Sequence, residues 1–136
     1  MDLELDGAVV NCATRSGSRL ASSLPKIGLA SKAMGIGETG KFVMIEVMHE
    51  PDAKDLVIAV ASGCTALVSP CPNGNLSSKI EELGIGVRGW MREVGIDRIE
   101  RIGRRNLRAN DFDTAAISGL RLVGYDRPLK MWLELR

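Results

Sequence analysis

The chain has 136 residues, of which 45% are hydrophobic and 26% are charged, so it carries enough apolar material for one domain core under an ordinary charged surface. Its 18 basic and 17 acidic residues give a net charge of +1, which excludes a whole-molecule field that would draw it to nucleic acid or to an anionic membrane. The acidic start lacks the basic flank and apolar run of a signal peptide, and no later stretch suits a bilayer span, so we expect a cytoplasmic protein.

The first half of the chain contains two segments that predict strands and one that predicts a helix. Residues 7–13 (GAVVNCA) are β-branched and bounded by polar residues, which favours a buried strand. Apolar residues then recur at helical spacing, and Pro25 places the start of that helix near itself. Residues 41–48 (KFVMIEVM) are apolar almost throughout, as in a strand that is covered on both faces.

The segment 55–60 (DLVIAV) is ambiguous between strand and helix. Its composition suits a buried strand, whereas Pro51 and Asp52 ahead of it and Gly63 behind it frame a helix. Periodicity alone does not decide. If the segment is a helix, residues 65–69 become the third strand, and the order β, α, β, α, β has right-handed crossovers between parallel neighbours.

The second half is predicted to be helical. Ser78 and Glu81 have the spacing of a capping box, and Gly95 ends the amphipathic pattern that follows. Asp97 is expected to cap a short helix that ends near residue 103, and Asn110 or Asp111 to cap another that ends at residues 117–119. The residues after 124 alternate like an extended segment. One apolar stripe runs along the first helix and consists of Ile80, Leu83, Val87, Trp90, Met91 and Val94.

A glycine-rich stretch at residues 35–41 (GIGETGK) fits the GxGxxG fingerprint and most of the GxxxxGK phosphate loop. Both motifs require a strand before the loop and a helix after it, so that backbone N–H groups and the helix end point at phosphate. Here a helix enters and a strand leaves, and Phe42 replaces the hydroxyl residue that would hold magnesium. The stretch therefore predicts a plain helix-to-strand turn.

Three further sets of residues are candidate sites. Cys64 and Cys71 lack a third and fourth ligand nearby, which favours free, buried thiols over a metal site. His49 follows a strand at the end where parallel sheets bind ligands, so an acid–base role is one interpretation. The other, which is favoured, is a solvated loop histidine. The arginines of residues 98–108 suit phosphate or carboxylate, but few aromatics flank them, so a helix face or partner contact is favoured over nucleic acid.

Four segments of the chain resemble the C-terminal portion of the synthase domain of FMN-dependent glutamate synthases, a (β/α)8 barrel. They are residues 102–128 (IGRRNLRANDFDTAAISGLRLVGYDRP), the helix at 78–94, residues 7–18 and residues 53–68. The resemblance implies an α/β fold. Residues 1–74 would form a three-stranded parallel βαβαβ segment of the barrel, and residues 75–136 a helical C-terminal region and extended tail packed with it as one domain. It also favours helix for the ambiguous segment.

The resemblance implies FMN-dependent formation of glutamate from 2-oxoglutarate and ammonia. The positions it places near the cofactor are Arg15, Ser16, Gly17 and Ser18 after the first strand, His49 after the second and Ser69 after the third. The sequence departs from the family here, because glycines that let backbone N–H groups reach the FMN phosphate are replaced, and Glu50 and Pro70 stand among the replacements. Only residues 71–74 match the family's Cys-Pro-x-Gly, so no complete iron–sulfur site or other metal site is expected.

Three strands of an eight-stranded barrel leave two open edges whose N–H and C=O groups must be paired or covered. We therefore expect another polypeptide or a second copy to complete the sheet, and the chain to be inactive alone. The alternative is a non-catalytic interaction or regulatory module that uses the arginine cluster at residues 98–108.

Overall fold

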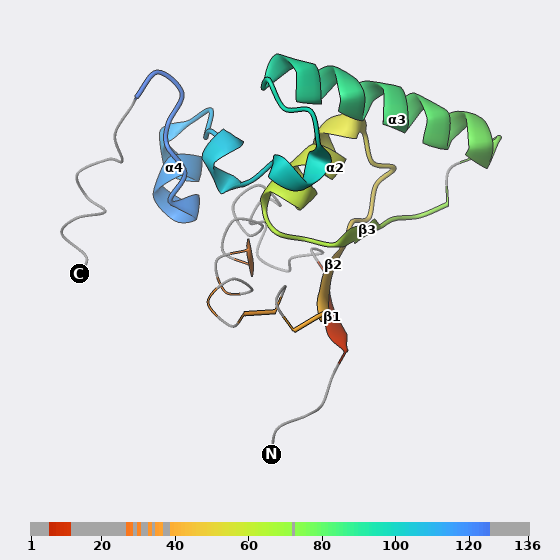
Figure 1. The fold of residues 1–136 in the computed structure, drawn as a ribbon, viewed down its shortest axis with the longest axis horizontal. Helices are drawn as coiled ribbons and strands as arrows, with labels where there is room; N and C mark the ends of the chain where they lie inside the picture. The colour runs from red at the N-terminus through yellow and green to blue at the C-terminus, as the bar shows by residue number, and fades with distance from the viewer. Residues whose placement is uncertain are drawn as a thin grey trace.

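A computed structural model describes residues 6–11, 27, 28, 30, 33, 35, 36, 39–71 and 73–125. Their fold is α/β, as expected, with a three-stranded parallel sheet and helices (Figure 1). The elements in chain order are β1 (Gly7–Asn11), β2 (Phe42–Glu46), α2 (Ala53–Ala61), β3 (Ala66–Val68), α3 (Leu76–Glu93), the 3₁₀ turns η1 (Ile99–Arg101) and η2 (Arg104–Asn106), and α4 (Phe112–Ser118).

The strands lie in the sequential order β1-β2-β3, and all pairs are parallel. Ile45 pairs with Val10 on one side and with Leu67 on the other. Paired residues of parallel strands point to the same face of a sheet, so this register gives one face to Val43 and Ile45 and the other to Phe42 and Met44. The predicted three parallel strands, with a helix between the second and the third, are therefore confirmed.

Among the described residues, the face of Val43 and Ile45 is the more deeply covered one. Both residues are buried in a cluster with Val47, Ala59 and Cys64, and Ile45 is fully buried. The covering side chains come from α2 and from the crossover between β1 and β2, which contributes Ile27 and Ile36. In that crossover Gly28 approaches α2 so closely that a Cβ would overlap the carbonyl of Ser62. Both crossovers therefore lie on the same face.

The opposite face of the sheet, here called the open face, carries Val9, Met44 and Val68. Val9 is 56% exposed and Val68 is 38% exposed. The prediction of a buried first strand is wrong in the described part of the chain, because sequential winding puts both crossovers on one side. The prediction of a second strand covered on both faces holds fully for one face only, since Phe42 and Met44 on the other face are half-buried. Apolar composition alone does not reveal that one-sidedness.

The ambiguous segment is the helix α2, and its N-terminus explains why. Asp52 accepts a hydrogen bond from the backbone N–H of Asp55 at 2.8 Å, and the Asp55 carboxylate accepts one from the backbone N–H of Asp52 at 3.1 Å. This reciprocal capping box satisfies two of the N–H groups that a helix leaves free.

The helix α3 lies across α2 and extends beyond it (Figure 1). It begins a turn earlier than predicted, because Asn75 rather than Ser78 is its N-cap and accepts from the N–H groups of Ser77 at 2.9 Å and Ser78 at 3.4 Å. Gly95 follows its end with a φ of 69°, as expected of a C-terminal glycine. None of the residues of α3 is fully buried.

The C-terminal region has a small apolar cluster of its own, made of Ala109, Ala115 and Leu120. Asp111 caps α4, and Gly119 ends it with a φ of 69°, so that prediction is confirmed. Asp97 is not a cap, since Arg98 holds the N-cap position of η1. The expected tail after residue 125 lies outside the described residues. Within those residues, no helix has the length and apolar content needed to cross a membrane.

Candidate functional site

The carboxyl ends of the strands carry polar side chains at the position where parallel sheets usually bind ligands. Asn11 ends β1 and Glu46 ends β2, and the Asn11 amide donates to the Glu46 carboxylate over 2.6 Å. This bond ties the two strand ends together on the open face.

His49 lies in the loop after β2 and is 57% exposed at its side chain. Its Nε2 atom is 3.0 Å from Oδ2 of Asp55, the same carboxylate oxygen that accepts from the backbone N–H of Asp52. A carboxylate partner orients an imidazole and leaves the other ring nitrogen free to exchange protons with a ligand. The pair also holds the loop against the N-terminus of α2, so the geometry fits an acid–base role and a purely structural role equally.

Glu50, in the same loop, binds Lys79 of α3 across 3.0 Å, and Glu82 lies 3.5 Å from the same ammonium group. The hydrogen bond from Lys79 to Glu50 raises the pKa of Lys79, and the charges of Glu50 and Glu82 add to the rise while desolvation opposes it. The ion pair joins the edge of the sheet to the first turn of α3.

The loop after β3 contains Ser69, whose hydroxyl donates to the carbonyl of Pro70 over 3.2 Å. Cys71 follows and is exposed, whereas Cys64 is buried and belongs to the core cluster. Neither thiol forms a disulfide within the described residues, but the prediction that both are buried is wrong for Cys71, because the loop carries it away from the covered face of the sheet. The described residues contain no group of His, Cys, Asp and Glu arranged to hold a metal ion.

The described part of this edge does not fit the phosphate of FMN. Its ionisable groups are mostly carboxylates, and its one lysine is held by Glu50 and Glu82. Carboxylates repel phosphate, and Pro70 has no N–H to offer it. His49 and Ser69 therefore lie at the expected edge without forming a phosphate cradle. The remaining predicted positions, Arg15, Ser16, Gly17 and Ser18, lie outside the described residues.

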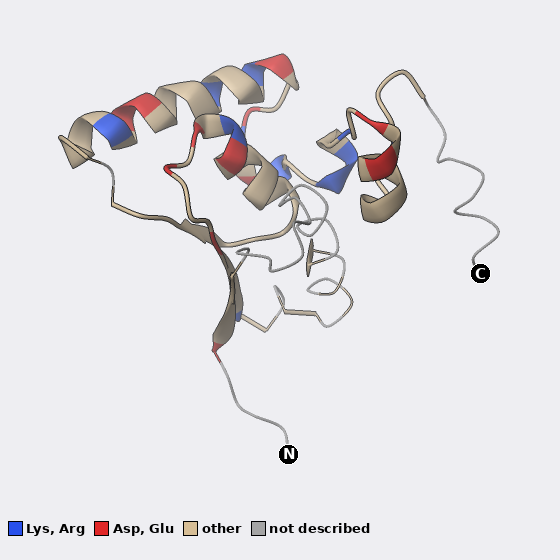
Figure 2. Cartoon of the chain, turned by 180° about the vertical axis from the view of Figure 1, so that it is seen from behind, with Lys and Arg blue, Asp and Glu red and all other residues tan. Residues whose placement is uncertain are grey.

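The arginine cluster lies in the segment that leads from α3 to α4 (Figure 2), and most of its members are engaged within the chain. Arg101 binds Asp97 across 2.7 Å, and Arg98 lies 3.4 Å from Glu100. The Arg104 guanidinium donates to the carbonyl of Ser118 over 2.7 Å, and partial burial lowers its pKa. A fourth member, Arg108, donates to the carbonyls of residues 105 and 107 at 2.6 and 2.8 Å. These bonds hold the segment between α3 and α4 together.

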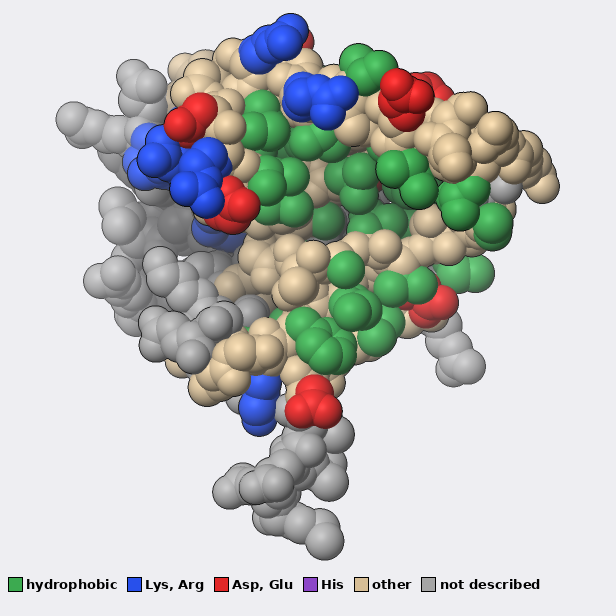
Figure 3. All heavy atoms as spheres, turned by 45° about the vertical axis from the view of Figure 1, so that its right-hand side comes forward, with side chains coloured by type: hydrophobic (Ala, Val, Ile, Leu, Met, Phe, Trp, Pro, Cys, Tyr) green, Lys and Arg blue, Asp and Glu red, His purple; other side chains and the backbone are tan. Residues whose placement is uncertain are grey.

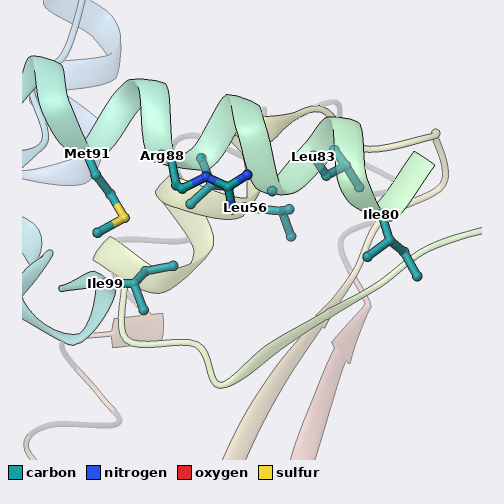
Figure 4. A pocket seen from close by; sticks show the side chains of 8 residues that line it. Leu56, Ile80, Leu83, Arg88, Met91 and Ile99 are labelled. Atoms are coloured by element: carbon teal, nitrogen blue, oxygen red, sulfur yellow. The ribbon is translucent and has the colours of Figure 1, made fainter. Parts of the chain in front are cut away.

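Two hollows lie away from the sheet edge. The first, called here the α2–α3 groove, has a volume of about 540 Å³ and is walled by Leu56, Ile80, Leu83, Val87, Met91 and Ile99, with Arg88 at its rim (Figure 4). The second, of about 500 Å³, lies between these helices and the segment before α4, and Lys54, Trp90 and Arg108 are among its lining. The apolar stripe on α3 indicates an apolar surface on this helix. The sequence does not show that Leu56 of α2 and Ile99 form the other wall of the groove.

The comparisons with known proteins add nothing to this geometry. The chain matches no family model, no curated protein and no solved structure.

Proposed function

We propose that this chain is a glutamate synthase-like barrel segment that supplies three strands to an assembly completed by another polypeptide and that is inactive alone. The completed assembly would carry out FMN-dependent formation of glutamate from 2-oxoglutarate and ammonia. The proposal combines the resemblance at residues 102–128 with the winding of the sheet.

The single observation that carries the proposal is the one-sided winding of the three parallel strands. Sequential parallel strands with both crossovers on one face are the repeating unit of a (β/α)8 barrel, in which the other face points inward and is packed by side chains. Here the open face exposes Val9 and Val68, and no strand in the described part of the chain pairs with the outer edge of β1 or β3. A barrel partner would cover the face and both edges at once.

The acidic edge supports the second half of the proposal, that the chain alone is not a catalyst. Because its described loops do not fit the FMN phosphate, the completing polypeptide would have to supply most of the cofactor's contacts. His49, oriented by Asp55, is the described side chain best placed to exchange a proton with a ligand at that edge.

The test is co-expression with a polypeptide that carries the first five strands of a glutamate synthase barrel. We expect the two chains to co-purify and the chain alone to be free of flavin absorbance. Val9→Lys should abolish co-purification because it places a charge on the open face. Val123→Lys is the matched control, since Val9 and Val123 are both 56% exposed and only Val9 belongs to the sheet.

Two results would contradict the proposal. One is a stable monomer by light scattering even when the five-strand polypeptide is present. The other is stoichiometric FMN in the chain purified alone, which would show that it needs no partner for the cofactor.

The alternative, an interaction module built on the arginine cluster, has less support. Arg98, Arg101, Arg104 and Arg108 already have partners within the chain, which leaves Arg105 as the exposed member whose side chain has no partner among the described residues.

A further inference from the structure

The α2–α3 groove is an apolar surface formed by α2, α3 and Ile99 of η1. Helix α3 has apolar residues along its whole length, yet Ile80 is 60% exposed and Trp90 is 37% exposed, and Val94, which follows the helix, is 38% exposed. Figure 3 shows hydrophobic side chains gathered in a continuous band beneath α3. A helix whose stripe is half covered gains from a second apolar surface that covers the rest.

The charges beside the groove are unsatisfied within the described part of the chain. Arg88 extends over the rim, and its Nη1 atom lies 3.5 Å from where a Cβ at Gly84 would be (Figure 4). Neither Arg88 nor Glu81 has an ion-pair or hydrogen-bond partner among the described residues, in contrast to Lys79. An occupant of the groove must therefore match an apolar strip flanked by one free cation and one free anion.

The positions of these charges on the helix select the occupant. Glu81 and Arg88 are two helical turns apart, which is about 10.5 Å along the axis, and they lie on the same flank of α3. When two helices pack antiparallel about a twofold axis, the same flank of each faces the other. Glu81 of each copy then meets Arg88 of the other, so a second α3 is complementary in charge.

The small and apolar residues suit the same axis, which passes between residues 84 and 85, midway between Glu81 and Arg88. Gly84 of each copy lies beside that axis and has no side chain, which lets the helices approach closely. Ile80 of one copy then lies about 3 Å along the helix from Met91 of the other, within reach of a side-chain contact.

We infer that a second copy of this chain docks in the α2–α3 groove, with α3 antiparallel to α3 about a twofold axis, and that paired contacts between Glu81 and Arg88 select this arrangement. The groove is lined by α2, α3 and η1 and by no strand residue, so the contact is separate from any completion of the barrel.

The experiment measures the self-association of the full chain by sedimentation equilibrium at low salt, with reductant present. We expect a reversible dimer. Each of the single variants Arg88→Glu and Glu81→Arg places like charges opposite one another in both symmetry-related contacts of the dimer. Each should therefore raise the dissociation constant of the dimer roughly tenfold. The double variant Glu81→Arg with Arg88→Glu should recover the original affinity. An equimolar mixture of the two single variants should form a mixed dimer, because one carries two arginines and the other two glutamates.

Two controls keep the test specific. Glu93→Arg reverses a charge on the far flank of α3 and should leave association unchanged, and the circular dichroism of every variant should match the parent. Val9→Lys should also leave this dimer intact, which separates it from the proposed barrel contact.

A monomer at high concentration would overturn the inference. So would a dimer that both single reversals leave unchanged, or one that the double variant does not restore. Binding of an unrelated acidic amphipathic helix in preference to a second copy would assign the groove to a different occupant and would equally overturn it.

Discussion

Helices α2 and α3 lie side by side, yet they are stabilised in different ways. The shorter one, α2, has 9 residues, buries Ala59 and Ala61, and lies between the sheet and α3. The longer one, α3, has 18 residues and buries none of them fully. Both have a side-chain cap at the N-terminus. The contrast shows that the position of a helix within the layers, rather than the length of its apolar stripe, sets how much of that stripe is buried.

The strongest test of this contrast compares two isoleucines. Ile45, which lies beneath α2, is 0% exposed, whereas Ile80 on α3 is 60% exposed. We expect Ile45→Ala to lower the free energy of unfolding by roughly 3 to 4 kcal/mol and Ile80→Ala by about 0.5 kcal/mol or less. Urea denaturation of the two variants measures both values. Equal losses would mean that α3 is buried as deeply as the core.

A smaller effect, with opposite signs, is expected from two glycines of α3. A Cβ at Gly86 would lie 2.5 Å from the Cβ of Ala53 on α2, whereas one at Gly89 meets nothing within 4 Å. Gly86→Ala should destabilise the chain by about 1 to 2 kcal/mol because it pushes the helices apart. Gly89→Ala should stabilise it by about 0.5 to 1 kcal/mol because alanine favours the helix.

Thermal unfolding monitored at the helical signal distinguishes the two glycine variants. If both were stabilising, the close approach of α2 and α3 would be absent in solution.

The smallest effect concerns Lys79, which connects α3 to the loop ahead of α2. Its pKa is raised above the ordinary 10.5 by Glu50, so the ion pair contributes stability below that pH and loses it as the pH rises through the higher folded pKa. The midpoint of urea unfolding should therefore fall more steeply above about pH 10 in the parent than in Lys79→Met. Lys54→Met, at an exposed lysine without an ion pair in the described residues, is the control and should retain the steep fall.

Local signals predicted much of the fold. The strand order, the cap at Asp111 and the end of α4 at Gly119 follow from spacing and residue type, which act over a few residues. The capping box of α2 is also present in the sequence, since Asp55 is an acidic residue three positions after the N-cap Asp52. The sequence-based prediction of this helix rests on Asp52 alone. Asn75 and Ser78 are both residue types that cap helices and lie one turn apart, so residue type alone does not identify Asn75 as the N-cap of α3.

The rest depends on contacts between residues far apart in the sequence. The exposure of Val9 follows from which side the crossovers take, and no property of residues 7–13 encodes that choice. His49 was identified from its place after a strand, but its pairing with Asp55 needed the loop path. Likewise, the sequence around Lys79 does not show that this residue pairs with Glu50, because the two are brought together only by the fold.

The exposed thiol of Cys71 affects how this protein must be handled. An accessible cysteine on a loop oxidises in air and can crosslink two molecules, whereas Cys64, buried in the core cluster, is shielded from such reagents. A covalent dimer formed through Cys71 would mimic a specific complex in any sizing experiment. The same accessibility allows a maleimide dye to be attached there, beside the carboxyl end of β3, as a fluorescent reporter of what binds to that edge of the sheet.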